Sequence, residues 1–208
     1  MGTYTFYTNP MSRGQIARWA LHEVSADYEQ VLVDWGNKPA AFLKANPMGK
    51  VPTIVHHSAD GDKVVTETAA ICHYLAEMHP EAGLLPRDAE MADYFRWIFF
   101  AAGPVEAAIT TRALGLQLPP EKEMMAGWGN LERTLTTLED HFEDRRFVCG
   151  DRFTMADVYV GSQVDWGLTF GSIAPKEAFV AYAERLQGRP AYKAAKGVDN
   201  ELIERMKR

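Results

Sequence analysis

Three absences narrow the function of this chain before any motif is considered. Its 208 residues include only two cysteines, Cys72 and Cys149, which form neither a Cys-x-x-Cys pair nor a metal-site spacing. No apolar run approaches the roughly 20 residues that a membrane-spanning helix needs. No basic stretch followed by an apolar one opens the sequence, as a signal peptide would. Cysteine chemistry, a metal site and a membrane span are therefore not expected.

The charge balance also excludes classes of partner. Lys and Arg number 22 against 28 Asp and Glu, which gives a net charge of −6. Such a surface argues against nucleic-acid binding and favours an acidic cytoplasmic protein. An apolar fraction of 47% is enough for a substantial core. The length fits one large domain or two small ones.

The order of expected elements divides the chain into two parts. The first reads strand, helix, strand, short helix, hairpin and helix, over residues 3–7, 15–24, 28–33, 40–44, 51–65 and 68–78. The segment 79–89 contains two prolines and a glycine and is expected to be a linker. Only helices are expected after it, over residues 90–102, 105–114, 122–145, 154–168, 176–186 and 192–207. We therefore expect an α/β thioredoxin-like domain over 1–78 and an all-α helical bundle over 90–208.

One stretch of the first part is suited to holding a small peptide. Pro52 has no N–H for a sheet ladder, which predicts an edge strand or a bend before one and leaves the backbone of Val51 available. A cis Val51–Pro52 bond is not expected, because only about 5–6% of such bonds are cis. Glu67 and Thr68 then offer a carboxylate, a hydroxyl and unpaired helix N-terminal amides.

These two segments, Asn46 to Ile54 and Thr66 to Leu75, resemble the glutathione-binding half of the cytosolic glutathione S-transferases. A third segment, Gly150 to Asp157, resembles the helix-capping segment of that family's all-helical domain, with Thr154 and Asp157 as a capping box. The resemblance covers essentially the whole chain and is to bacterial members of the serine or cysteine type. It implies glutathione as co-substrate, no metal, and a homodimer.

The group that stabilises the glutathione thiolate is expected between the first strand and the first helix. Ser12 is the first choice, because the family's serine- and cysteine-type members carry their sulfur-contacting residue there. Ser12 and Gln15 also fit a capping box, which is compatible because a hydroxyl accepts and donates at once. The other candidates are Tyr7, which matches the tyrosine-type members, and Thr8 and Asn9, which match relatives that act on disulfides.

The resemblance assigns the remaining site residues. The expected glutathione-binding residues are Lys38, Lys50, Val51, Pro52, Glu67 and Thr68. The expected residues of the electrophile site are Met11, Trp97, Phe100, Ile109, Arg112 and Trp166, although aromatic residues at helical spacing usually belong to a core.

The predicted activity is glutathione transfer to a small hydrophobic electrophile, as in detoxification. Two alternatives stay open at this point. One is glutathione-dependent reduction of disulfides or peroxides through Thr8 or Asn9. The other is a non-catalytic protein that binds ligands or other proteins, against which the intact pair of Val51–Pro52 and Glu67–Thr68 argues.

Overall fold

The computed structural model describes residues 3–207 and divides the chain into two compact units. The first unit joins the chain up to Gly83 with the segment from Gly188 onward, and the second is Leu84–Gln187. The sequence placed the whole of 90–208 in one helical domain, whereas the contacts group the last helix with the first unit. The functional bounds of the two domains stay a prediction.

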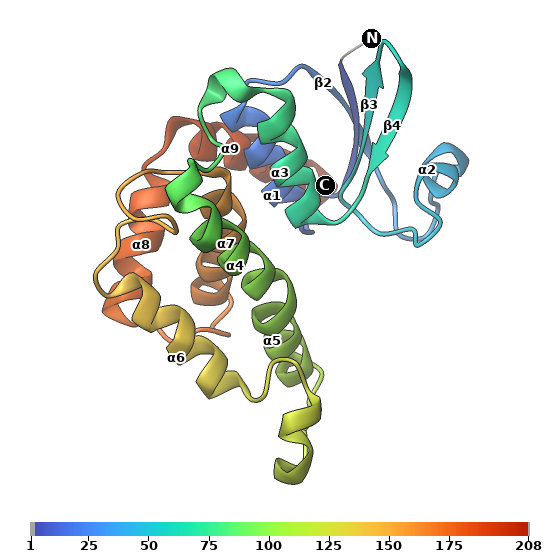
Figure 1. Ribbon diagram of the computed structural model, residues 1–208. Coiled ribbons are helices and arrows are strands. Elements are labelled where there is room, and N and C mark those ends of the chain that lie inside the picture. The colour runs from blue at the N-terminus through green and yellow to red at the C-terminus, as the bar shows by residue number, and fades with distance from the viewer. Residues whose placement is uncertain (1–2, 208) are drawn as a thin grey trace. The chain divides into compact units, whose positions relative to one another are not determined.

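The first unit is a mixed four-stranded sheet covered by helices on both faces (Figure 1). Its elements are β1 (Tyr4–Thr8), α1 (Gly14–Glu23), β2 (Tyr28–Leu32), α2 (Ala40–Ala45), β3 (Thr53–Ser58), β4 (Gly61–Val65), α3 (Thr68–Met78), a 3-10 turn (Pro80–Ala82) and α9 (Pro190–Met206). The strand order is β2-β1-β3-β4, with β2 parallel to β1 and the other pairs antiparallel. The predicted thioredoxin-like fold is confirmed.

The alternation of β1 explains how both faces are covered. Side chains that are neighbours along a strand point to opposite faces of the sheet. The ring of Tyr7 packs 5.3 Å from that of Phe42 on α2, whereas Phe6 lies under the guanidinium of Arg18 on α1, 5.3 Å away. Helices α1 and α3 therefore cover one face, and α2 covers the other (Figure 1).

The sequence predicted that the strand after Pro52 lies at the edge of the sheet, and this prediction is wrong. It begins at Thr53 and is central, between β1 and β4. Pro52 stands just before the ladder, where its missing N–H costs the sheet nothing. The Val51–Pro52 bond is cis, so the expectation of a trans bond is also wrong.

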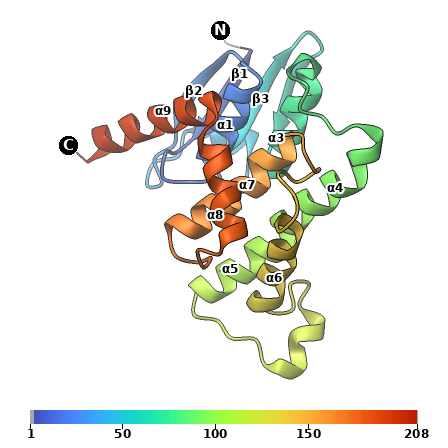
Figure 2. The ribbon, with the colours of Figure 1, turned by 90° about the vertical axis from the view of Figure 1, so that its left-hand side faces the viewer.

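Helix α9 packs against α1, and side chains join the two along their contact (Figures 1 and 2). The guanidinium of Arg189 donates to both carboxylate oxygens of Glu23, at 2.6 Å each. One turn along, the Trp19 and Tyr192 rings meet edge to face at 5.1 Å. Polar contacts of Gln15 and Arg18 with α9 continue the seam. These contacts fix α9 to the sheet through α1.

The second unit is helical. Its elements are a 3-10 turn (Asp88–Glu90), α4 (Met91–Phe100), a π-helical turn (Ala101–Val105), α5 (Glu106–Ala113), a 3-10 turn (Pro120–Met125), α6 (Leu131–Phe142), α7 (Met155–Thr169) and α8 (Glu177–Gln187). The expected break at Gly103-Pro104 is absorbed by the π-helical turn between α4 and α5. Among residues 3–207, no helix is long and apolar enough to cross a membrane.

The long helix predicted over 122–145 is wrong. Gly129 adopts a left-handed φ of +61°, and Asn130 caps the following helix by accepting from the backbone N–H of Arg133 at 2.9 Å. A glycine in this conformation ends a helical path, and an Asn with a bonded side chain starts a new one. The amphipathic pattern through Leu131, Leu135 and Leu138 therefore belongs to the shorter α6.

The predicted capping box at the start of α7 is confirmed. The Asp157 carboxylate accepts from the backbone N–H and the hydroxyl of Thr154, at 2.8 and 3.1 Å. It also accepts from the backbone N–H of Val148 at 2.7 Å and from the hydroxyl of Tyr182 on α8 at 2.9 Å. One buried carboxylate thus joins the loop before α7, the α7 start and α8.

Candidate functional site

The ends of three strands bring the predicted glutathione-binding segments to one edge of the sheet. Tyr7 pairs with Thr53, and Ile54 pairs with Val65. The loop that follows β1, the turn that precedes β3 and the segment that follows β4 therefore leave the sheet at the same edge. The loop after β2 does so too, because Leu32 pairs with Thr8 in parallel. Every predicted glutathione-binding residue lies in one of these segments.

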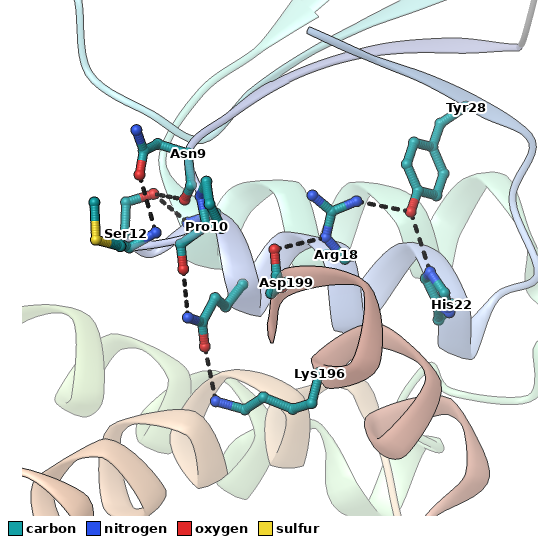
Figure 3. Close-up of polar contacts among 11 residues, drawn as sticks. Asn9, Pro10, Ser12, Arg18, His22, Tyr28, Lys196 and Asp199 are labelled. Carbon is teal, nitrogen blue, oxygen red and sulfur yellow. Dashed lines mark hydrogen bonds and ion pairs between the residues drawn. The ribbon is translucent and has the colours of Figure 1, made fainter. Parts of the chain in front are cut away.

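Ser12 lies in the loop between β1 and α1, half-buried (Figure 3). Its hydroxyl donates to the carbonyl of Asn9 at 2.6 Å and accepts from the backbone N–H of Gly14 at 3.0 Å. The expected capping box with Gln15 is absent, because α1 begins at Gly14 and Ser12 stands outside it. The amide of Gln15 donates instead to the carbonyl of Pro10 at 2.5 Å.

The other candidate donors are less accessible than Ser12. Tyr7 is 8% exposed and packs in the core under α2. The side chain of Asn9 is engaged at both ends, donating to the Val33 carbonyl at 3.1 Å and accepting from the Met11 N–H at 2.9 Å. Thr8 is fully buried, and its hydroxyl has no partner within residues 3–207.

Gly14 makes the close approach of α1 to this loop possible. A Cβ at this position would lie 2.0 Å from the hydroxyl oxygen of Thr8 and 3.1 Å from that of Ser12. The first distance is far shorter than atoms in contact tolerate and the second is tight, so a larger residue would require the Thr8 side chain or the loop to shift. The N-terminal amides of α1 thereby stay beside Ser12.

Asn46 holds the turn that presents Val51. Its amide donates to the Lys50 carbonyl at 2.8 Å and to the Thr53 hydroxyl at 3.0 Å, and its carbonyl oxygen accepts from the Met48 N–H at 3.1 Å. Within residues 3–207, the backbone of Val51 has no hydrogen-bond partner. Sequence reasoning missed this role of Asn46, although an Asn before a proline is a turn signal.

The two lysines differ in exposure. Lys38 is half-buried, and its ammonium lies beside Gly49, 3.1 Å from where a Cβ would stand on that glycine. Lys50 is exposed. Neither side chain forms an ion pair within the described part of the chain. Both cations are therefore available to an anion at this edge.

Glu67 has a backbone conformation that residues other than glycine rarely adopt. Its φ is +64°, and it is exposed directly before α3. No side chain caps α3, and Thr68, the first helical residue, is 8% exposed. Such backbone geometry costs of order 1–3 kcal/mol and is concentrated at ligand sites. A carboxylate and unpaired helix amides are thus presented together.

The six predicted electrophile-site residues are spread over both units. Met11 is 61% exposed in the β1–α1 loop. Trp97 is 2% exposed, and its ring lies 4.0 Å from that of His141, inside the second unit. Phe100, Ile109 and Trp166 are half-buried. Arg112 is exposed and lines a hollow of about 440 Å³ between α5 and α6.

Among residues 3–207, no three His, Cys, Asp or Glu side chains are arranged to hold a metal ion. The electrostatics of the two thiols also make them poor nucleophiles. Burial raises the pKa of Cys72 well above its usual range and that of Cys149 to about 11. Neither thiol is therefore suited to act as a thiolate near neutral pH.

Comparison with known proteins identifies the family. The family model for the N-terminal domain of glutathione S-transferases matches residues 2–77, and that for the C-terminal domain matches residues 106–166. A glutathione transferase of known structure from Methylococcus capsulatus strain Bath is 30% identical, with a TM-score of 0.77 over 95% of this chain and 98% of that one.

Two further relatives agree. A sphingomonad glutathione S-transferase, solved with glutathione bound, is 27% identical, with a TM-score of 0.74 over 94% of this chain and 98% of that one. Glutathione S-transferase GstA of Escherichia coli O157:H7 is 27% identical over 82% of this chain and 86% of its own length. With both domains matched and a 30% identical relative covered almost completely, this chain belongs to the glutathione S-transferase family.

Proposed function

We propose that this protein is a glutathione transferase that binds glutathione at the sheet edge and activates its thiol through Ser12. The observation that carries the proposal is the convergence of the Ser12 loop, the unpaired Val51 backbone and the Glu67–Thr68 helix start. The sphingomonad relative, 27% identical, holds glutathione in its crystal structure. Glutathione serves as co-substrate, and no metal is needed.

Each part of glutathione has a complementary group in this arrangement. The backbone of Val51 pairs with the cysteinyl unit, with Pro52 shaping the turn. Glu67 binds the γ-glutamyl amine, while Thr68 and the unpaired α3 amides bind its carboxylate. Lys38 and Lys50 are cations for the glycyl carboxylate. Of the two, Lys38 is half-buried and lies beside Gly49.

The thiol needs stabilisation as an anion, because a free thiol has a pKa of about 8.5. The hydroxyl of Ser12 donates to the Asn9 carbonyl here, and rotation about its C–O bond redirects that proton to a bound sulfur. The Gly14 N–H continues to hold the hydroxyl oxygen during this rotation. The α1 N-terminus adds positive potential at the same place.

Replacing Ser12 with alanine tests this role. We expect the pKa of the bound thiol to rise towards that of free glutathione. Turnover should fall by at least tenfold, since a side chain positioned to exchange a proton with the reacting group typically contributes about 10²-fold or more to the rate. Glutathione affinity should change little. Ultraviolet titration of the thiolate absorbance measures the pKa, and an identical pKa in parent and variant would remove Ser12 from the mechanism.

Replacing Glu67 with alanine tests the γ-glutamyl contact. Loss of a charge-assisted hydrogen bond costs about 1.4–2.8 kcal/mol, which corresponds to a 10- to 100-fold weaker Kd for glutathione. Isothermal titration calorimetry measures it. Glu77→Ala, at the far end of α3 from the site, is the matched control and should bind as the parent does. Unchanged binding by Glu67→Ala would show that Glu67 does not bind the γ-glutamyl amine.

The second substrate in this proposal is a small hydrophobic electrophile. Of its predicted contacts, Met11 and Arg112 are exposed, and Trp97 has little surface left for a ligand. The reductase alternative gains no support, because the Thr8 hydroxyl is fully buried and both ends of the Asn9 amide are engaged. A depressed thiol pKa in the complex distinguishes a transferase from a non-catalytic binding protein.

Detoxification, a cytoplasmic location and a homodimer complete the proposal, each from the family resemblance. The dimer is the easiest to test. Light scattering in solution should give twice the 23.3 kDa chain mass. A mass of one chain at micromolar concentration would reject it.

A further inference from the structure

A line of hydrogen bonds leads from α9 to the loop that carries Ser12 (Figure 3). The ammonium of Lys196 donates to the side-chain oxygen of Gln15 at 2.7 Å. The amide nitrogen of Gln15 donates to the carbonyl of Pro10 at 2.5 Å. Residues 181 positions apart in sequence thus share one contact line that ends in the active-site loop.

The chemistry of the three groups permits one orientation of the Gln15 amide. An ammonium has only donors and a proline carbonyl only accepts, so the oxygen must face Lys196 and the nitrogen must face Pro10. A cation bonded to the oxygen also makes the amide N–H a stronger donor. Without Lys196, only the Pro10 carbonyl holds the amide in that orientation.

The Pro10 carbonyl, which accepts the Gln15 bond, is one residue along the chain from the carbonyl that Ser12 contacts. Ser12 donates its hydroxyl proton to the carbonyl of Asn9, the residue directly before Pro10. The Asn9 side chain is pinned to Val33 and Met11. The bond from Gln15 to Pro10 therefore restrains the loop on the side facing α9, and the Asn9 bonds restrain it at the sheet.

Lys196 is itself fixed. It lies 5.7 Å from the centre of the Tyr192 ring. Burial raises the pKa of the nearby Asp199 carboxyl, and Arg18 and, to a smaller extent, the charge of Lys196 oppose that rise. Asp199 is buried and paired with Arg18 of α1 at 2.9 Å. The Gln15 bond and the Tyr192 ring thus keep the ammonium beside α1, where α9 packs on that helix.

We propose that Lys196 is a positioning residue for the thiol site, acting through Gln15 to fix the Pro10 carbonyl and with it the Ser12 hydroxyl. The inference rests on the role proposed above for Ser12. It assigns to α9, outside every predicted site segment, a part in setting the thiol pKa.

The decisive variant is Lys196→Met, which keeps most of the apolar length of the side chain and removes the donor. We expect the pKa of bound glutathione to rise by about one unit and kcat to fall roughly tenfold, because small misplacements of a catalytic group cost 10- to 100-fold. KM for glutathione should change less than threefold. Lys196→Arg, which retains a donor, should recover most of the activity.

The matched control is Lys193→Met, on an exposed position one turn earlier on α9. It removes the same charge from the same helix without touching Gln15, and it should titrate and turn over as the parent does. Gln15→Leu should reproduce Lys196→Met. The double variant should lose no more than either single one, since both break the same line.

The outcomes separate this inference from the proposed function. If Ser12→Ala raises the thiol pKa but Lys196→Met and Gln15→Leu do not, the inference is wrong and the transferase proposal stands. If the parent itself shows no lowered thiol pKa, both fall. Equal losses in Lys193→Met and Lys196→Met would mean a general charge effect and overturn positioning. Backbone amide shifts of Met11 and Ser12 provide a readout apart from activity, and they should move in Lys196→Met alone of the two lysine variants.

Discussion

Replacing Asp199 with alanine is expected to lower the free energy of unfolding by about 3–5 kcal/mol. Arg18 and Asp199 form an ion pair at 2.9 Å with side chains 0% and 1% exposed. Removing the carboxylate leaves the guanidinium of Arg18 buried without a counter-charge. A buried charge without a partner costs far more than a surface one, because the protein interior replaces water poorly.

The surroundings of Arg18 offer no replacement for the lost carboxylate. Only one oxygen of Asp199 is bonded, and among residues 3–207 neither its second oxygen nor the Nη2 of Arg18 has a partner. The hydroxyl of Tyr28 accepts from Nη1 at 3.0 Å, and the Phe6 ring lies 5.3 Å away. These contacts cannot replace a full negative charge.

The control for this prediction lies on the same helix. Glu201 and Arg205 form an exposed ion pair, with side chains 75% and 73% exposed, and Glu201→Ala should cost less than about 1 kcal/mol. The double variant Arg18→Met with Asp199→Leu should recover much of the lost stability, because apolar residues need no partner. Urea unfolding measures all three. An Asp199→Ala loss as small as that of Glu201→Ala would contradict the prediction.

Replacing Asp157 with alanine is expected to cost more than about 3 kcal/mol. Its carboxylate accepts from two buried backbone N–H groups and two hydroxyls. Each donor left unsatisfied costs about 1–3 kcal/mol. Tyr182→Phe, which removes one donor and leaves the carboxylate bonded to the others, is the matched control and should cost about 1 kcal/mol.

The same substitution changes the pH dependence of stability. Burial raises the pKa of Asp157 to about 6, above the value of roughly 3.9 in an unfolded chain. The folded state therefore binds this proton more tightly than the unfolded state does. The contribution is largest below about pH 4 and is lost as the pH rises to 6, by up to roughly 3 kcal/mol. The stability difference between parent and Asp157→Ala should shrink over that interval, and a constant difference would contradict it.

Local signals in the sequence located most elements of the first unit. Helix α3 spans Thr68–Met78 as predicted, because the helical periodicity of its apolar residues has clear limits in the sequence. The hairpin predicted within 51–65 turns at Asp60-Gly61, a dipeptide typical of hairpin turns, and pairs β3 with β4. The capping box of Thr154 and Asp157 was readable because its two partners are three residues apart. Each of these signals depends on residues that are close together in the sequence.

The features that sequence analysis did not predict depend on long-range contacts or on backbone conformation. An amphipathic pattern concealed the left-handed turn at Gly129, since a glycine inside a pattern does not reveal its φ. Ser12 matched a capping motif, yet the helix begins two residues later. The partner of Arg18 lies on α9, 181 residues away, where no spacing rule reaches. The predicted site residues rest on motif resemblance and stay predictions. The hydrogen bonds made by the side chains of Asn46, Gln15 and Lys196 emerged only from the structure.

The discontinuous first unit has a consequence for how the protein is made. Helix α9 completes the unit that β1 begins, and the continuous second unit lies between them in sequence. On the ribosome, the second unit has all its residues before residues 190–206 exist. At about 5–20 residues per second, the interval between Gly83 and α9 is roughly 5–20 s. During that time Arg18 and Trp19 on the nascent α1 have no α9 to cover them, so the first part to emerge is the last to become native.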